Sequence, residues 1–143
     1  MESDLLSHPV VPVAGEKDAH ATLDALLPYL TEESRLTIVH VVEKAGGAPD
    51  KASVEQREEY AQEAFDAAAE HCEEAGIEYE TRLAYGRNVS KAIFDAATEV
   101  DATAVAFVPR KGSRLLRFIT GDTTLDLVTE AELPVIALPG GDG

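Results

Sequence analysis

The feature that most constrains the fold is a regular alternation of short apolar runs with amphipathic segments of helical spacing. The apolar runs predict strands at about 8–14, 35–42, 77–84, 103–108 and 133–138. Strictly alternating strands and helices form a parallel sheet with right-handed crossovers. The nearly continuous apolar run at 35–42 fits such a sheet, because helices cover both of its faces. Pro9 and Pro12 are awkward in a buried first strand, because proline has no N–H to donate.

The segments between the strands predict four helices, at about 18–30, 54–75, 88–100 and 122–131. We expect Asp18 to cap the first helix, Asn88 or Ser90 to cap the third, and Gly76 to end the second. The apolar positions that repeat at helical spacing are predicted to face the core: Leu23, Leu26, Leu27, Leu30; Ala61, Ala64, Phe65, Ala68, Cys72; Ile93, Ala96, Ala97, Val100.

The length of 143 residues predicts a single domain over 1–143, with a core at about 8–139 and flexible termini. No run of about 18 apolar residues is present, so we expect no membrane insertion. The single cysteine, Cys72, excludes an internal disulfide and indicates a reduced, cytoplasmic location. Neither a metal cluster nor a catalytic residue is predicted.

The charge balance is strongly acidic, with a formal net charge of −15 and 27 Asp and Glu spread along the chain. A nucleic-acid-binding protein should show the opposite balance, so this class is excluded. Dispersed carboxylates with few lysines suit concentrated salt, where the Debye length falls to about 3 Å near 1 M and self-repulsion is screened. We therefore hypothesise a halophilic source, such as a haloarchaeon; the alternative is an acidic mesophile protein.

One segment departs from this acidity. Four of the twelve Lys and Arg residues lie within eight positions, at Arg110, Lys111, Arg114 and Arg117. Ligands of parallel α/β sheets bind beyond the carboxyl ends of the strands, where the winding reverses. We predict that this rim comprises residues 14–18, 40–43, 85–90 and 109–112, so that the basic segment lies beside it.

Three stretches resemble the universal stress protein family. They are Val10-Val11-Pro12-Val13, Leu36-Thr37-Ile38-Val39-His40-Val41-Val42 and the final block from Thr103 to Leu138, and the resemblance covers about residues 8–139. It implies an adenine nucleotide alpha hydrolase-like fold, an α/β domain of three layers with five parallel strands in the order 3-2-1-4-5. Many members bind ATP through Gly-x2-Gly-x9-Gly-Ser/Thr after the fourth strand. Many dimerise through the last strand, which here spans 134–138.

The nucleotide motif is degenerate in this chain. Pro109 occupies the first glycine position, Gly112 and Gly121 fit the second and third, and Asp122 replaces the hydroxyl residue. Only eight residues separate the last two glycines, and Ala14 stands where ATP-binding members have an aspartate. Thr123 and Thr124 could supply hydroxyls.

Basic side chains could offset the lost donors. Arg110, Lys111 and Arg114 could hold AMP, ATP or a phosphate-like anion through charge-assisted hydrogen bonds. The alternatives are salt bridges with the acidic surface and a protein partner. The predicted ligand or anion site comprises Ala14, Gly15, Val41, Gly86, Arg87, Pro109, Arg110, Lys111, Gly112, Gly121, Asp122 and Thr123.

The resemblance implies a dimeric binding or regulatory module in stress response. Alternatives are a cytosolic regulatory domain that partners a membrane transporter, and a slow ATPase, which no general base or magnesium-binding carboxylate set supports. His40 is interpreted as a packing residue and Cys72 as a buried apolar one. His8, His20 and His71 lie in separate elements and show no ligand spacing.

Overall fold

A computed structural model describes residues 5–43, 51–109 and 127–139. In these residues a parallel sheet has the order β3-β2-β1-β4-β5, which confirms the predicted fold class and strand order. The strands are β1 (Pro9–Pro12), β2 (Arg35–Glu43), β3 (Glu78–Gly86), β4 (Ala104–Phe107) and β5 (Val135–Ala137). The chain winds from β1 outward to β3 and then returns to β4 on the other side of β1, so the winding reverses between β1 and β4.

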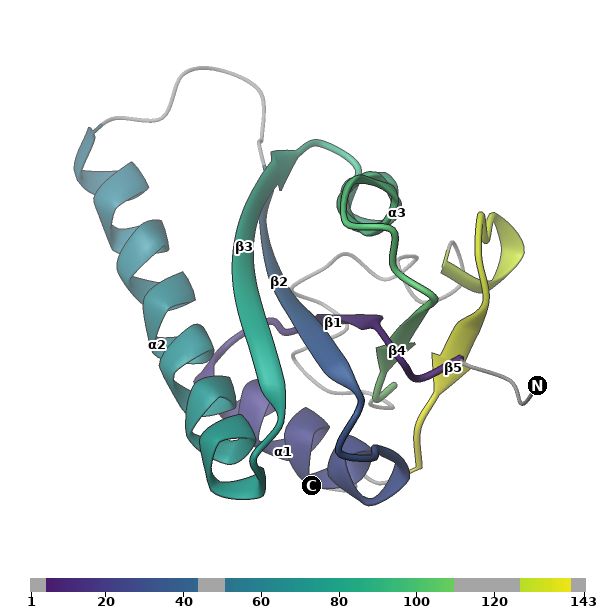
Figure 1. Ribbon diagram of the computed structural model, residues 1–143. Coiled ribbons are helices and arrows are strands. Elements are labelled where there is room, and N and C mark those ends of the chain that lie inside the picture. The colour runs from purple at the N-terminus through teal and green to yellow at the C-terminus, as the bar shows by residue number, and fades with distance from the viewer. Residues whose placement is uncertain (1–4, 44–50, 110–126, 140–143) are drawn as a thin grey trace.

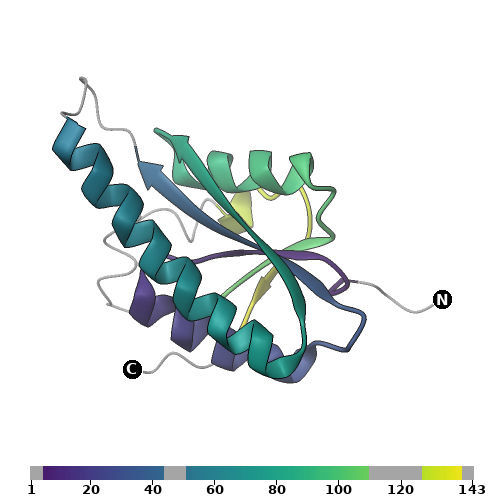
Figure 2. The same ribbon diagram turned by 60° about the vertical axis from the view of Figure 1, so that its left-hand side comes forward.

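Helices cover both faces of the sheet. They are α1 (Glu16–Leu26) with the short 3-10 helix η1 (Leu27–Tyr29), α2 (Lys51–Ala75) and α3 (Val89–Glu99). Figures 1 and 2 show α1 and α2 on one face and α3 on the opposite face. Residues 127–129 are helical, and the remainder of the helix predicted at 122–131 lies mainly outside the described residues.

Two apolar clusters, one on each face, form the core. Under α1 and α2, the fully buried side chains of Leu23, Leu26, Ala64 and Ala68 share a cluster with Val11 of β1 and with Val13, which follows that strand. Leu27 and Leu30 are only partly buried. On the other face, Ile93, Ala96 and Ala97 of α3 pack on Val10 and Val39. The apolar helix faces predicted from the sequence are therefore confirmed. Neighbouring residues of a buried strand face opposite helix layers, so Val10 and Val11 lie in different clusters.

The two prolines of β1 lie at positions where the sheet does not need their missing N–H. β1 pairs with β2 over Val10–Pro12 and with β4 over Pro9–Val10. Val13 donates to Val39 of β2 at 2.9 Å, so by alternation an N–H at Pro12 would point toward β4, beyond the last paired residue of that ladder. Pro9 would point toward β2, before that ladder begins. A central strand tolerates these prolines because each one lies just outside the hydrogen-bonded ladder that its missing N–H would face.

The helix ends follow local chemistry. Gly76 has a φ of 73°, and Ile77 donates back to Cys72 O at 2.9 Å, which closes α2 as predicted. Asn88 caps α3 by accepting from Lys91 N at 3.0 Å. The prediction for α1 is wrong: its N-cap is Gly15, and Asp18 lies inside the first turn.

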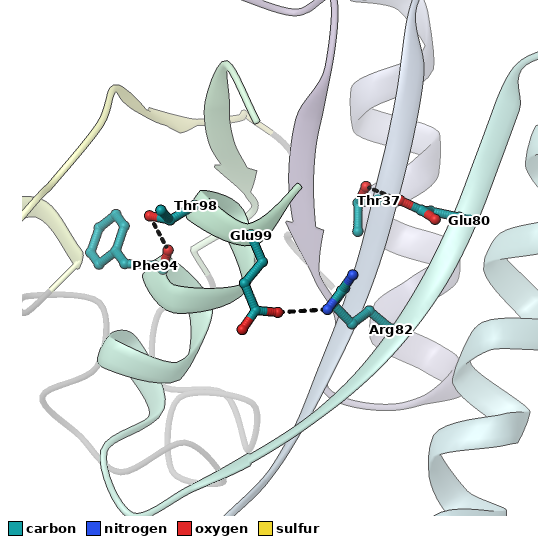
Figure 3. A network of polar contacts seen from close by, with 6 residues as sticks. All are labelled: Thr37, Glu80, Arg82, Phe94, Thr98 and Glu99. Atoms are coloured by element: carbon teal, nitrogen blue, oxygen red, sulfur yellow. Dashed lines mark hydrogen bonds and ion pairs between the residues drawn. The ribbon is translucent and has the colours of Figure 1, made fainter. Parts of the chain in front are cut away.

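An ion pair links the carboxyl-terminal end of α3 to the sheet (Figure 3). Arg82 of β3 forms an ion pair with Glu99 at 2.7 Å, and Thr98 donates to the carbonyl of Phe94 at 3.0 Å. Beside them Thr37 donates to Glu80 across β2 and β3 at 3.2 Å. The Arg82–Glu99 pair joins α3 to β3, whereas the Thr98–Phe94 bond lies within α3 and the Thr37–Glu80 bond joins two strands.

Among the described helices, none combines the length and apolarity that crossing a bilayer requires.

Candidate functional site

The reversal of winding between β1 and β4 is the expected position of a ligand site in this fold. The residues that follow these two neighbouring strands are Val13, Ala14 and Gly15 after β1, and Val108 and Pro109 after β4. The strands remain joined to their outer neighbours near this edge: Val13 donates to Val39 O at 2.9 Å and Leu138 to Phe107 O at 2.8 Å. The carboxyl ends of β1 and β4 are thus neighbours in a parallel sheet.

A buried carboxylate closes the turn between β1 and α1. Asp18 accepts from Ala14 N at 2.7 Å and from Thr22 Oγ1 at 3.2 Å, and only 7% of the residue is exposed. The Ala14 N–H is thereby satisfied within the protein. Because Glu16 and Asp18 both lie in the first turn of α1, this helix start is unfavourable for a phosphate group.

An aromatic side chain of α2 lies against this turn. A Cβ at Gly15 would come within 2.9 Å of Tyr60 Cζ and closer still to its hydroxyl, so glycine permits the approach of the ring. Tyr60 is 46% exposed and forms an edge contact with His40, with ring centres 6.0 Å apart. Tyr60 thus presents a large aromatic surface at the edge of the sheet where β1 ends.

His40 of β2 contacts both the Tyr60 ring and the backbone that follows β1. Its Nδ1 lies 2.9 Å from Val13 O, and because a carbonyl only accepts, Nδ1 carries the proton. Burial lowers the pKa of His40 below its ordinary value, so the ring is neutral near pH 7. The interpretation of His40 as a packing residue agrees with this hydrogen bond, which fixes the end of β1 next to β2.

The turn after β3 lies on the same edge but two strands from β1. Gly86 is the last residue of β3, paired with Glu43, and Arg87 is exposed. Ser90 donates to Asn88 Oδ1 at 2.8 Å, so the turn is held by the helix cap. Gly86 and Arg87 therefore belong to the predicted rim but not to the point where the winding reverses.

The predicted site residues divide into two groups. Ala14, Gly15 and Pro109 follow the two central strands, and Val41 is a buried residue of β2 that packs toward α3. The other predicted residues lie outside the described part of the chain: Arg110, Lys111, Gly112, Gly121, Asp122 and Thr123, together with Arg114, Arg117 and Thr124.

Sequence reasoning missed Tyr60, although a signal was available. Tyr60 directly precedes Ala61 on the predicted apolar face of the second helix, and a large aromatic at the border of such a face can reach the sheet edge. Cys72 is fully buried as predicted, and burial raises the pKa of its thiol to about 11, so it is a poor nucleophile at neutral pH.

His20 and His71 lie in separate elements, α1 and α2, as the sequence indicates, and the structure adds a contact between them. His20 and His71, which show no ligand spacing in the sequence, lie in contact between α1 and α2, with His20 Nδ1 2.8 Å from His71 Nε2. The sequence could not show this, because the contact depends on how two helices pack. In the described residues no group of three His, Cys, Asp or Glu side chains is arranged to hold a metal ion.

The chain matches a known protein family over most of its length. The family model described as Universal stress protein family matches residues 8–139. No curated protein matches the chain.

Solved structures share the fold. A universal stress protein family member from Burkholderia pseudomallei is 24% identical, with a TM-score of 0.72 over 96% of this chain and 99% of that one. A universal stress protein from Archaeoglobus fulgidus in complex with dAMP is 21% identical, with a TM-score of 0.60 over 94% and 99%. An Arabidopsis thaliana family protein with AMP bound is 16% identical, with a TM-score of 0.58 over 90% of each chain.

Proposed function

Because the chain belongs to the universal stress protein family, we propose that it is a regulatory module of the stress response that binds an adenine mononucleotide where β1 and β4 end. The observation that carries the proposal is the ring of Tyr60 against Gly15, half exposed at the point where the winding of the sheet reverses. An aromatic face in this position can stack on a nucleobase. Related structures were solved with dAMP, cAMP and AMP, which are all mononucleotides.

The chemistry of the edge favours one phosphate over three. The Ala14 N–H is already taken by Asp18, and Pro109 has no N–H, so two backbone donors are lost to a phosphate chain. The carboxylates of Glu16 and Asp18 add negative charge at the start of α1. A ligand with fewer charges is therefore preferred, with Arg110, Lys111 and Arg114 as the proposed phosphate-binding residues.

Equilibrium binding of AMP and ATP, in matched salt, tests the proposal. We expect AMP to bind more tightly than ATP. Tyr60→Leu should weaken AMP binding about 5- to 150-fold, because stacking of a base on an aromatic ring contributes about 1–3 kcal/mol. Tyr29→Leu is the matched control, since Tyr29 is also exposed (51%) but lies on η1. Equal effects of the two substitutions, or no AMP binding, would contradict the proposal.

We also propose that the protein dimerises through residues 134–138. β5 is an edge strand, Val135 and Ile136 are half-buried, and Ala137 is exposed, so the strand offers unpaired backbone groups and apolar side chains. Pro134 precedes the strand and leaves its later donors available. Light scattering of the native protein and of an Ile136→Lys variant tests this, and a monomeric native protein would refute it.

A cytoplasmic location, based on the single cysteine, and a halophilic source, based on the charge of −15, remain part of the proposal. Loss of the fold on dialysis into low salt is the expected behaviour. The alternative activities have separate readouts: a phosphate-release assay for a slow ATPase, and pull-down of a membrane transporter for a regulatory partner domain.

A further inference from the structure

We propose that His20 and His71 form a binding site for a divalent late transition-metal cation, of the nickel, copper and zinc class, between α1 and α2. Each helix contributes one imidazole, and the two rings are in direct contact. Neutral imidazole is the protein ligand that suits these metals. The two side chains are only partly buried, so a cation can reach them from solvent.

The hydrogen bonds define which nitrogens face one another. Asp24 lies 3.5 Å from His71 Nδ1 and favours a proton there, which leaves the lone pair of His71 on Nε2. That lone pair points to His20 Nδ1, 2.8 Å away. A shift of the His20 proton from Nδ1 to Nε2 keeps the ring neutral and gives two lone pairs on facing nitrogens. A carboxylate behind a histidine is the usual support of a metal-bound imidazole.

The spacing of the rings already fits a shared metal. Metal–nitrogen bonds of about 2.0–2.1 Å that meet at roughly 90–110° hold the two ring centres about 4.5–5.2 Å apart. The ring centres of His20 and His71 are 5.0 Å apart, with an angle of 65° between the planes. The rings therefore need to turn, but the helices do not need to move.

The surroundings attract cations. His20 lines a groove of about 630 Å³ together with the carboxylates of Glu16, Glu63, Asp66, Glu70 and Glu73. Glu16 and Asp24 lie four residues before and after His20, on the same face of α1. The carboxylates raise the local cation concentration. Because the described residues do not offer three converging ligands, water completes the coordination. A bound ion would join α1, which begins directly after Gly15, to α2, which carries Tyr60.

Thermal unfolding of the full chain with and without NiCl2, at pH 7.5 and fixed salt in the absence of nucleotide, tests the site. Nickel should raise the Tm of the native protein by several degrees, and His20→Gln and His71→Gln should each abolish the shift. MgCl2 should produce no comparable shift, because it binds carboxylates but not imidazole. A nickel shift that persists in both histidine variants, or no shift in the native protein, overturns the proposal.

Two further measurements separate a built site from general attraction to acids. Asp24→Asn should weaken nickel binding about 10-fold, as loss of an outer carboxylate does. Glu32→Gln, which removes an exposed carboxylate outside the groove, should leave nickel binding unchanged. The electron paramagnetic resonance spectrum of bound Cu²⁺ should show two imidazole nitrogens in the native protein and one in His71→Gln. Equal spectra would contradict the assignment.

Discussion

Replacement of Gly15 by alanine separates the stability of the turn from its proposed role in binding. The backbone of Gly15 is extended, with φ −178° and ψ −176°, so alanine can adopt it without strain. The new methyl group would overlap the tip of the Tyr60 side chain, whose Cζ would lie 2.9 Å away. We therefore expect Gly15→Ala to leave the protein nearly as stable as before but to displace the ring of Tyr60.

The magnitude follows from how far the ring must move. Nonbonded carbon atoms are in favourable contact at about 3.5–4.0 Å, so the tip must shift by about 1 Å. Tyr60 is 46% exposed, and a swing of about 10–15° at χ1 provides this movement at a cost below about 1 kcal/mol. Glycine-to-alanine replacement gains about 0.4–1 kcal/mol through the unfolded chain. The net change in the free energy of unfolding should lie within about 1 kcal/mol of zero.

Urea unfolding and AMP titration of the same variant provide the assay. The free energy of unfolding of Gly15→Ala should be nearly unchanged, whereas AMP should bind at least about 5-fold more weakly. In the double variant, Tyr60→Leu should add little further loss of AMP affinity, because both substitutions act on the same stacking surface. Gly86→Ala is the control for a contact that cannot move aside. Its Cβ would lie 3.3 Å from Ala92 Cβ, which the α3 backbone holds in place, so the substitution should lower the free energy of unfolding by about 1–2 kcal/mol. A decrease of more than about 3 kcal/mol in the free energy of unfolding of Gly15→Ala would show that the Tyr60 ring cannot move aside. Unchanged AMP affinity would refute the role of Tyr60 in binding.

Three further predictions concern stability. Asp18→Ala should cost about 1–3 kcal/mol in urea unfolding, because it leaves the Ala14 N–H without its carboxylate; a cost below about 0.5 kcal/mol would contradict this. Gly76→Ala should cost about 1–2 kcal/mol, because φ is 73° there; an increase in Tm would contradict it. The pKa values of His8 and His40 lie below 6.5, chiefly because of burial, so the unfolded chain takes up protons that the folded chain refuses. The stabilising contribution of the two histidines should therefore be complete above about pH 6.5 and decrease as pH falls toward the folded-state pKa values. The free energy of unfolding should fall by at most about 1.4 kcal/mol per pH unit for each histidine. A free energy of unfolding that stays constant from pH 7.5 to 5 in about 1 M salt would argue against this.

Much of the fold could be predicted because it depends on local patterns. The apolar run at 35–42 and the helical spacing of Ala61, Ala64 and Ala68 each arise from a single element. Strand order came from the resemblance and is confirmed. The difficulty with Pro9 and Pro12 disappeared only when the two ladders of β1 were known, because tolerance of proline depends on which neighbour each N–H faces.

The contacts between elements could not be predicted in the same way. Asp18 was expected at a helix cap, but its carboxylate turns back to the Ala14 N–H, a local alternative that residue type does not distinguish. The contact of Tyr60 with Gly15 and the pairing of His20 with His71 both depend on the packing of α2. Packing of this kind is set by the whole core, and the sequence alone shows no more than the place of Tyr60 at the border of an apolar helix face.

The most direct test of mononucleotide binding where β1 and β4 end is to follow backbone amide resonances of the isotopically labelled protein during titration with AMP. Binding at this edge should produce the largest shifts at Ala14, Gly15 and Tyr60 and at Val108, which follows β4, with small changes at the opposite ends of the strands. An absence of shifts, or shifts concentrated at the amino ends of β2 and β3, would contradict it.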